Sequence, residues 1–161
     1  MNRVASVCSR PAFILFVTMI LGSLFGIDRI RAEGADGWIA LFDGRSLAGW
    51  KASENTGAWQ VQDGCLVACG ERSHLFYDGP IANHDFRNFD LEMQVRTKPR
   101  ANSGVYFHTK FQPSGWPEQG YEVQINNSYT GTGNYRELKK SGSLYGVRNT
   151  FKSNVLDGEW F

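Results

Sequence analysis

Two short segments, 103–110 and 120–126, alternate polar and apolar residues with the two-residue period of a β-strand. One face of these strands is predicted to carry Tyr106, His108, Lys110, Glu122, Gln124 and Asn126. The opposite, buried face is predicted to carry Val105, Phe107, Thr109, Tyr121, Val123 and Ile125. Residues on one face of a strand lie about 6.6 Å apart. If the strands are neighbours, the polar side chains share a patch about the size of one sugar ring.

The chemistry available to this patch is that of a carboxylate close to an imidazole and amides. Glu122 could serve as a general base or as a metal ligand. His108 could serve as an acid, or as a second ligand through a neutral imidazole nitrogen. The alternatives without function are a solvated strand glutamate and an isolated histidine.

Short strands are predicted on both sides of the patch. They span residues 38–42, 58–61, 65–68, 74–77, 89–97 and 143–147. Asp63-Gly64 predicts a β-hairpin, and the strict alternation in 89–97 indicates a strand with one solvated face in an antiparallel sheet. Beyond the N-terminal region no segment has the pattern of an amphipathic helix, so the fold class is an all-β sandwich. The polar segment 127–143 is predicted to be a long loop, and such loops usually have a function.

The N-terminus has the three parts of an export signal. Arg3 and Arg10 precede an apolar run at 11–27, and Ala32 supplies a small residue at a cleavable point. We therefore predict a signal peptide with a signal helix at 1–32, a domain at 33–161, and a periplasmic or secreted location. The alternative is an uncleaved membrane anchor, although about 17 apolar residues are at the short limit for a spanning helix.

The charge of the chain bears on its partners. The net charge is +1, and without residues 1–32 it becomes −2, because 13 basic and 15 acidic residues remain. This mild negative balance, with no basic run, argues against nucleic acid as a partner. Contact with a membrane is expected only through the signal segment.

Two cysteines in the predicted domain are not expected to bond to each other. Cys65 and Cys69 are four positions apart on an extended segment, which separates them by about 13 Å. A disulfide needs Cα atoms within about 7 Å. Two small buried thiols are the simpler prediction.

Four motifs in sequence order resemble the 3-keto-disaccharide hydrolase domain family. They are LFDGRSLAGW at 41–50, WQVQDGCL at 59–66, NSGVYF at 102–107 and GYEVQI at 120–125. The resemblance implies a concanavalin-like jelly-roll sandwich of two antiparallel sheets in an exported bacterial protein. It also implies hydrolase or lyase activity on 3-keto-glucosides, as in 3-keto-glucoside lyases and 3-keto-glucal hydratases.

The sequence departs from the family pattern at two places. The family often has arginine where His108 stands, and its domains continue beyond a Gly-Glu-Trp-Asn element, where this sequence has Gly158-Glu159-Trp160-Phe161. The resemblance therefore predicts a domain that lacks its C-terminal strands.

The implied reaction removes the C2 proton beside the ketone, eliminates the C1 substituent and adds water. It needs a base and a group that stabilises the enolate oxygen. Glu122 and His108 are the catalytic candidates, with a divalent metal ion as an open alternative and no cofactor otherwise indicated. The substrate-binding candidates are Asn102, Tyr106, Gln124, Trp116 and Glu92.

The simpler roles and the competing function classes stay open. Trp116 could anchor a loop instead of stacking on a sugar, and Glu92 could pair with Arg96 on its own strand. The competing class is a non-catalytic carbohydrate-binding module with the same partner, a glycoside. A non-functional gene remnant is a third interpretation.

Overall fold

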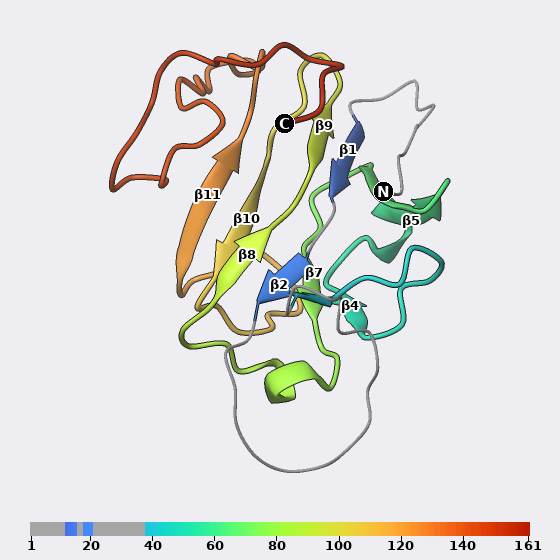
Figure 1. The fold of residues 1–161 in the computed structure, drawn as a ribbon. Coiled ribbons are helices and arrows are strands. Elements are labelled where there is room, and N and C mark those ends of the chain that lie inside the picture. The colour runs from blue at the N-terminus through green and yellow to red at the C-terminus, as the bar shows by residue number, and fades with distance from the viewer. Residues whose placement is uncertain (1–11, 16–17, 21–37) are drawn as a thin grey trace.

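The structure is a computed structural model that describes residues 12–15, 18–20 and 38–161 (Figure 1). The strands are β1 (Ala12–Leu15), β2 (Thr18–Ile20), β3 (Trp38–Ala40), β4 (Trp50–Ala52), β5 (Trp59–Gln62), β6 (Cys65–Cys69), β7 (Leu75–Tyr77), β8 (Asp90–Glu92), β9 (Val95–Thr97), β10 (Ser103–Phe107) and β11 (Tyr121–Ile125). The helical segments in this part of the chain are two 3-10 turns, η1 (Thr56–Ala58) and η2 (Ile81–His84). The predicted all-β class is confirmed.

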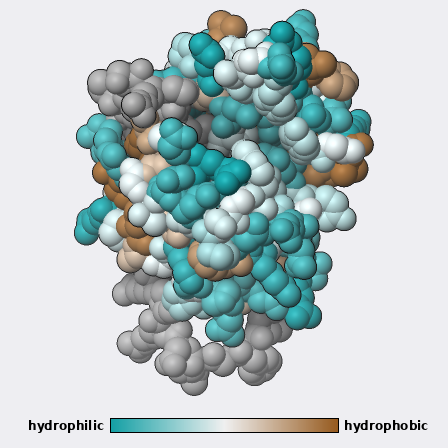
Figure 2. All heavy atoms as spheres, turned by 180° about the vertical axis from the view of Figure 1, so that it is seen from behind, coloured by the Kyte–Doolittle hydropathy of each residue, from teal (hydrophilic) through white to brown (hydrophobic). Residues whose placement is uncertain are grey.

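The strands pair antiparallel in four small sheets, with the orders β5-β6-β1-β9, β3-β2-β8, β4-β7 and β10-β11. The organisation into the two sheets of a jelly roll stays a prediction. Among the residues described, no helix is long and apolar enough to cross a membrane. The face seen from behind Figure 1 mixes hydrophilic residues with separate hydrophobic groups (Figure 2).

The hairpin between β5 and β6 forms at the predicted turn. Asp63 and Gly64 have φ angles of 48° and 80°, and Gln62 pairs with Cys65 across the turn. Positive φ at both central residues gives the backbone twist that matches two antiparallel strands. Cys65 on β6 is a free buried thiol, and burial raises its pKa to about 12. Cys69 is disulfide-bonded, so the two cysteines do not pair with each other, but the prediction of a second free thiol is wrong.

The predicted strand 89–97 is present as β8 and β9, with a break at residues 93–94. Both pieces pair with strands from the N-terminal apolar run in one continuous register. Asp90 lies opposite Ile20 on β2, and Thr97 lies opposite Phe13 on β1. On the other edge of β9, Val95 and Phe161 exchange two backbone hydrogen bonds of 2.8 and 3.0 Å.

Part of the predicted signal segment is therefore described, as strands. β1 inserts between β6 and β9, and β2 inserts between β3 and β8. The predicted signal helix is not confirmed by these seven residues. The rest of 1–32 and the predicted cleavage point at Ala32 lie outside the described residues.

β10 and β11 are neighbours, as the patch requires, and Tyr106 lies opposite Glu122. The predicted solvated face is wrong beyond Glu122, because Gln124 and Asn126 are 2% and 0% exposed. The loop 127–143 folds back over this end of the sheet, and the Asn126 amide donates to the carbonyls of Tyr129 and Lys139. The predicted strand 143–147 is reduced to two isolated bridges of Leu144, one with Val123 and one with Arg148.

Candidate functional site

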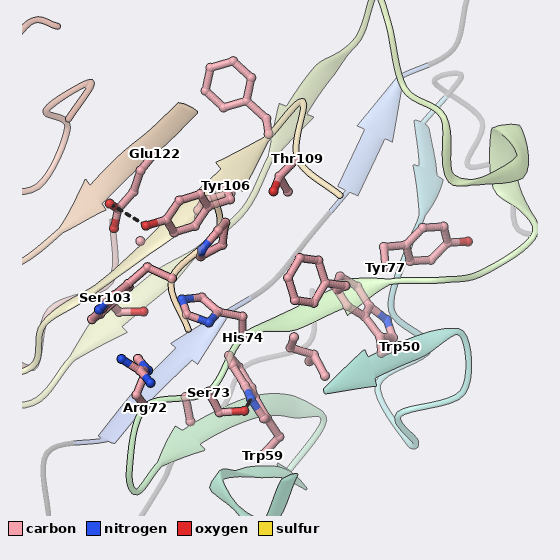
Figure 3. A pocket seen from close by; sticks show the side chains of 18 of the residues that line it. Trp50, Trp59, Arg72, Ser73, His74, Tyr77, Ser103, Tyr106, Thr109 and Glu122 are labelled. Carbon is pink, nitrogen blue, oxygen red and sulfur yellow. Dashed lines mark hydrogen bonds between the residues drawn. The ribbon is translucent and has the colours of Figure 1, made fainter. Parts of the chain in front are cut away.

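A cleft of about 1600 Å³ opens beside β7, β10 and the loop that follows β10 (Figure 3). It contains five of the residues predicted from the sequence: Asn102, Tyr106, His108, Trp116 and Glu122. Figure 3 shows Tyr106 between Glu122 and His74, which lies at the start of β7. The two short segments of the patch therefore meet a third one, at residues 72–76, that the sequence did not connect to them.

Glu122 and Tyr106 form a hydrogen-bonded pair in the cleft. The Tyr106 hydroxyl donates to Oε2 of Glu122 over 3.0 Å. Burial raises the pKa of Glu122 and the charge of Glu137 adds to this, whereas the Tyr106 hydrogen bond lowers it. A half-buried carboxylate with a raised pKa binds a proton more readily than an exposed one. This property suits a general base.

Gly104 provides the space that the Glu122 side chain occupies. A Cβ atom at position 104 would lie 2.1 Å from Oε1 and 2.6 Å from Cγ of Glu122. These distances are far below van der Waals contact, so any larger residue at 104 would displace the carboxylate. Glycine here is a requirement of the site.

His74 and Trp116 continue the wall of the cleft beyond Tyr106. The His74 ring contacts Tyr106 and Trp116 edge to face, with centroid distances of 5.7 and 5.3 Å. Trp116 is 58% exposed, so most of its indole is free to receive a ligand. Aromatic rings of this kind provide large apolar faces at low conformational cost.

The loop that carries Trp116 is anchored to residue 54. Glu54 accepts two hydrogen bonds from Arg72, with Nε–Oε1 at 2.7 Å and Nη2–Oε2 at 3.2 Å. The same carboxylate accepts the backbone N–H of Gly115 over 3.1 Å. Arg72 also lies over the Trp116 ring, 5.6 Å from its centroid. Trp116 is therefore held from both its backbone and its ring.

The loop 127–143 contributes a buried carboxylate behind Glu122. Glu137 is 1% exposed and accepts hydrogen bonds from the hydroxyls of Tyr135 and Tyr145. Burial opposes the charge of Glu137, but these hydroxyls and the Lys139 backbone N–H and ammonium together hold its pKa below the ordinary value. Because Glu137 stays charged, its field favours the protonated form of Glu122.

His108 lies in the cleft but not where the alternation placed it. β10 ends at Phe107, and His108 has a φ of 54°, so the backbone turns before the imidazole could follow Tyr106 on the same face. Its ring contacts Phe89 and Phe107, with centroid distances of 5.9 and 5.5 Å. The prediction that His108 continues the face of Tyr106 is wrong for this reason.

Two other predicted binding residues lie away from the cleft surface. Gln124 is buried, and its amide donates to Oδ1 of Asn102 over 2.7 Å, so it positions a cleft residue and does not line the cleft itself. Glu92 lines a second cavity of about 1010 Å³ instead. Its suggested partner Arg96 lies 4.7 Å from the centroid of the Trp160 ring.

The structure adds no third ligand to the metal alternative. Within the described residues, no group of three or more His, Cys, Asp or Glu side chains is placed to hold a metal ion. Glu122 and His108 are therefore not joined by a third carboxylate, imidazole or thiol in a metal-binding group within the described residues.

Sequence reasoning missed His74, Arg72 and Gly104. His74 and Gly104 belong to segments that the sequence did identify, the strand at 74–77 and the NSGVYF motif, and Arg72 lies two positions before that strand. Their contacts with Tyr106, Glu54 and Glu122 join residues far apart in the chain. Glycine at 104 indicated that another group approaches the backbone closely there. The sequence alone did not identify that group as the Glu122 side chain.

Comparison with known proteins assigns the chain to a family. Residues 37–161 match the model of the 3-keto-alpha-glucoside-1,2-lyase-like domain. The chain belongs to this family. The family membership inferred from the four sequence motifs is therefore confirmed.

A curated relative from Bacteroides thetaiotaomicron, named 3-keto-disaccharide hydrolase, is 34% identical over 150 residues. The match covers 78% of this chain and 51% of the relative, so the chain spans about half the length of that relative. No solved structure matches the chain. Membership in a family of carbohydrate-active lyases and hydrolases is thus shown, while the reaction itself has to be argued from the site.

Proposed function

We propose that the cleft breaks the glycosidic bond of 3-keto-glycosides by removing the proton on C2. The ketone at C3 makes this proton acidic, because the electron pair left on C2 is delocalised onto the ketone oxygen. The enolate then forms the C1–C2 double bond and expels the C1 substituent, whose oxygen takes up a proton. Water adds across this double bond, hydroxyl to C1 and hydrogen to C2, and gives the free 3-keto sugar.

The observation that supports this proposal is the environment of Glu122. It is a half-buried carboxylate with a raised pKa in a cleft of about 1600 Å³, and one tyrosine hydroxyl orients it. The reaction needs one base at C2 and does not need the two carboxylates of ordinary glycosidases. We assign Glu122 the base role, with Tyr106 fixing the direction of its carboxylate.

The sugar ring is assigned to the space between this pair and Trp116. An exposed indole can cover one face of a sugar, whose C–H groups are apolar. Asn102, held by Gln124 over 2.7 Å, supplies an amide for hydroxyl groups. The jelly-roll arrangement implied by the family is part of the same proposal.

Replacement of Glu122 by Gln tests the base role. Glu122→Gln keeps the shape of the side chain but cannot accept the C2 proton, so release of 3-keto sugar should fall by at least about 10²-fold. Glu71→Gln is the matched control, because Glu71 is an exposed carboxylate on the rim of the same cleft. In D₂O, wild-type protein should exchange the C2 proton for deuterium, and Glu122→Gln should not.

A Glu122→Gln variant with wild-type turnover and an unchanged circular dichroism spectrum would contradict the assignment.

A carbohydrate-binding module is the second candidate, favoured by the 58% exposure of Trp116. Such a module would bind a glycoside without exchanging its C2 proton, and Trp116→Ala would weaken binding. Wild-type protein that binds 3-keto-glycosides but shows no exchange would establish the module and exclude the enzyme.

We also propose that residues 1–32 direct export to the periplasm or the medium. The arginine–apolar–alanine order supports this. N-terminal sequencing of exported material should find Glu33 first. An intact Met1 in that material would point to a retained N-terminus.

A further inference from the structure

Proton removal at C2 places negative charge on the ketone oxygen, and a hydrogen-bond donor must face that oxygen. This inference rests on the proposed function. Of the polar groups beside Glu122, the Tyr106 hydroxyl is already donating to the carboxylate. The Arg72 guanidinium already forms an ion pair with Glu54. Beyond Tyr106, on the side away from Glu122, the wall of the cleft continues with the His74 ring (Figure 3).

The backbone of His74 is fixed on both sides by one buried serine. The His74 N–H donates to Oγ of Ser53 over 2.9 Å, and the Ser53 N–H donates to the His74 carbonyl over 2.9 Å. Ser53 is 5% exposed. The ring itself is held between Tyr106 and Trp116. A donor at this position is therefore set in place before a ligand arrives, as electrostatic stabilisation of a transition state requires.

The two ring nitrogens of His74 have different surroundings. Among the described residues, two buried side-chain polar atoms lack a hydrogen-bond partner, Nδ1 of His74 and Oγ1 of Thr109. Nε2 of His74 is not one of them and has no hydrogen bond to the described residues, so it is open to the cleft that His74 lines. A second proton on the ring would put a charged N–H at the dry Nδ1 position without an acceptor.

The charge around His74 also favours the neutral ring. Burial lowers the pKa of His74, the positive charge of Arg72 lowers it further, and Glu54 acts weakly in the opposite direction. A neutral imidazole with its proton on Nε2 is a hydrogen-bond donor that keeps its proton.

We propose that His74, through a neutral Nε2–H, is the donor that stabilises the enolate oxygen at C3. Glu122 then removes the C2 proton on one side of Tyr106, and His74 faces the adjacent C3 oxygen on the other. No proton passes to or from His74 in this step. The oxygen gains charge while the hydrogen bond strengthens, and loses it again when the C1 bond breaks.

Two substitutions of His74 distinguish hydrogen-bond donation by its ring from packing of the ring. In His74→Gln the amide nitrogen can occupy the place of Nε2, whereas the shorter amide of His74→Asn reaches only the place of Nδ1. We expect His74→Asn to lower kcat by about 10²-fold with little change in KM, as for loss of one oxyanion donor. His74→Gln should keep kcat within about 10-fold of wild type. His84→Gln, which changes another histidine on the rim of the cleft, should match wild type.

The outcomes distinguish this inference from the proposed function. Glu122→Gln and wild type are assayed beside the histidine variants for C2 exchange in D₂O and for kcat against pH. If wild type shows no exchange, the proposed function fails. If Glu122→Gln is slow while His74→Asn matches wild type, or if both His74 variants lose activity equally, donation by His74 is wrong. A fall in wild-type rate at alkaline pH that His74→Gln abolishes would show a proton-donating imidazolium and would also overturn it.

Discussion

At the scale of single residues, burial and a hydrogen bond shift the pKa of Glu122 in opposite directions. Burial makes its charged form less favourable and raises its pKa, and the Tyr106 hydrogen bond stabilises the charged form and lowers it. A base must be charged to act, so its rate is expected to rise with pH through its own pKa. In the proposed base role of Glu122, the balance between burial and the Tyr106 hydrogen bond would therefore set the lower pH limit of activity.

Replacement of Tyr106 by Phe tests this balance. Tyr106→Phe removes the hydrogen bond that lowers the pKa of Glu122, so the acid limb of kcat should move to higher pH. Profiles of kcat against pH for the two proteins measure the shift. Tyr121→Phe is the control, because Tyr121 is exposed and stacks on Phe107. An acid limb of kcat that stays in place or moves to lower pH would show that the Tyr106 hydrogen bond does not lower the pKa of the catalytic base.

A second residue-scale prediction concerns Gly104. In Gly104→Ala the new Cβ would overlap the Glu122 carboxylate, so the side chain must turn away. Misplacement of a catalytic group by about 1 Å can lower a rate by about 10²-fold, and we expect a loss of that order in kcat. Gly57→Ala is the matched control, because a Cβ at 57 meets nothing within 4 Å. Crystallographic data showing an unmoved carboxylate in Gly104→Ala would contradict the explanation.

At the scale of elements, the anchor at Glu54 links one end of β4 to the loop that presents Trp116. The ion pair with Arg72 is partly exposed to solvent, and pairs that solvent reaches add little to stability. Its effect should therefore appear in ligand binding more than in the free energy of unfolding. The loop is the part of the cleft whose position depends on this contact.

Glu54→Gln tests the anchor. Loss of the charged contact to Arg72 and Gly115 should loosen the Trp116 loop and raise KM a few-fold, with kcat and the melting temperature nearly unchanged. Asp85→Asn is the control, since it removes another exposed ion pair at the cleft, Arg87–Asp85 at 3.1 Å, which includes no residue of the Trp116 loop. Equal KM values for the two variants would mean that the ion pair does not position Trp116.

The positions of the strands were easier to predict from the sequence than the residues that each strand contacts. Period-two alternation and the Asp63-Gly64 turn located β5, β6, β10 and β11, because these signals are local. The direction of Tyr106 and Glu122 into one patch followed from the same period. Local periodicity therefore accounts for the strands and for the central pair of the candidate site.

The rest of the site depends on contacts that no local pattern contains. Gln124 and Asn126 are buried because the loop 127–143 covers them, and that fold-back is a long-range event. His108 departs from the alternation because one residue adopts positive φ at the strand end. His74 joins the site only through pairing of β4 with β7, which the sequence does not specify.

At the scale of the whole molecule, β1 and β2 each lie between two strands and cover one edge of each. β6 and β9 both pair with β1, and β3 and β8 both pair with β2. An unpaired strand edge offers its backbone groups to other chains. The state of residues 12–20 should therefore govern how readily the domain associates.

Comparison of the full chain with residues 33–161 tests this. Without β1 and β2, the facing edges of four strands are exposed, and each large side chain that loses its cover forfeits about 1.5–3 kcal/mol. We expect residues 33–161 to form aggregates by size-exclusion chromatography. A monomeric 33–161 with a cooperative melt above about 50 °C would contradict this expectation.

The continuous register of β1 and β2 against residues 90–97 makes their pairing depend on the order in which the chain is synthesised. β1 and β2 cannot be engaged by an export apparatus while each is paired with a strand on both of its edges. Pairing and export would then compete for one segment, and the outcome would depend on which occurs first. Because β8 and β9 are made long after residue 20 during synthesis, the segment is free at first. If residues 1–32 direct export as proposed, the delay before 90–97 emerges and folds is the interval in which it would have to begin.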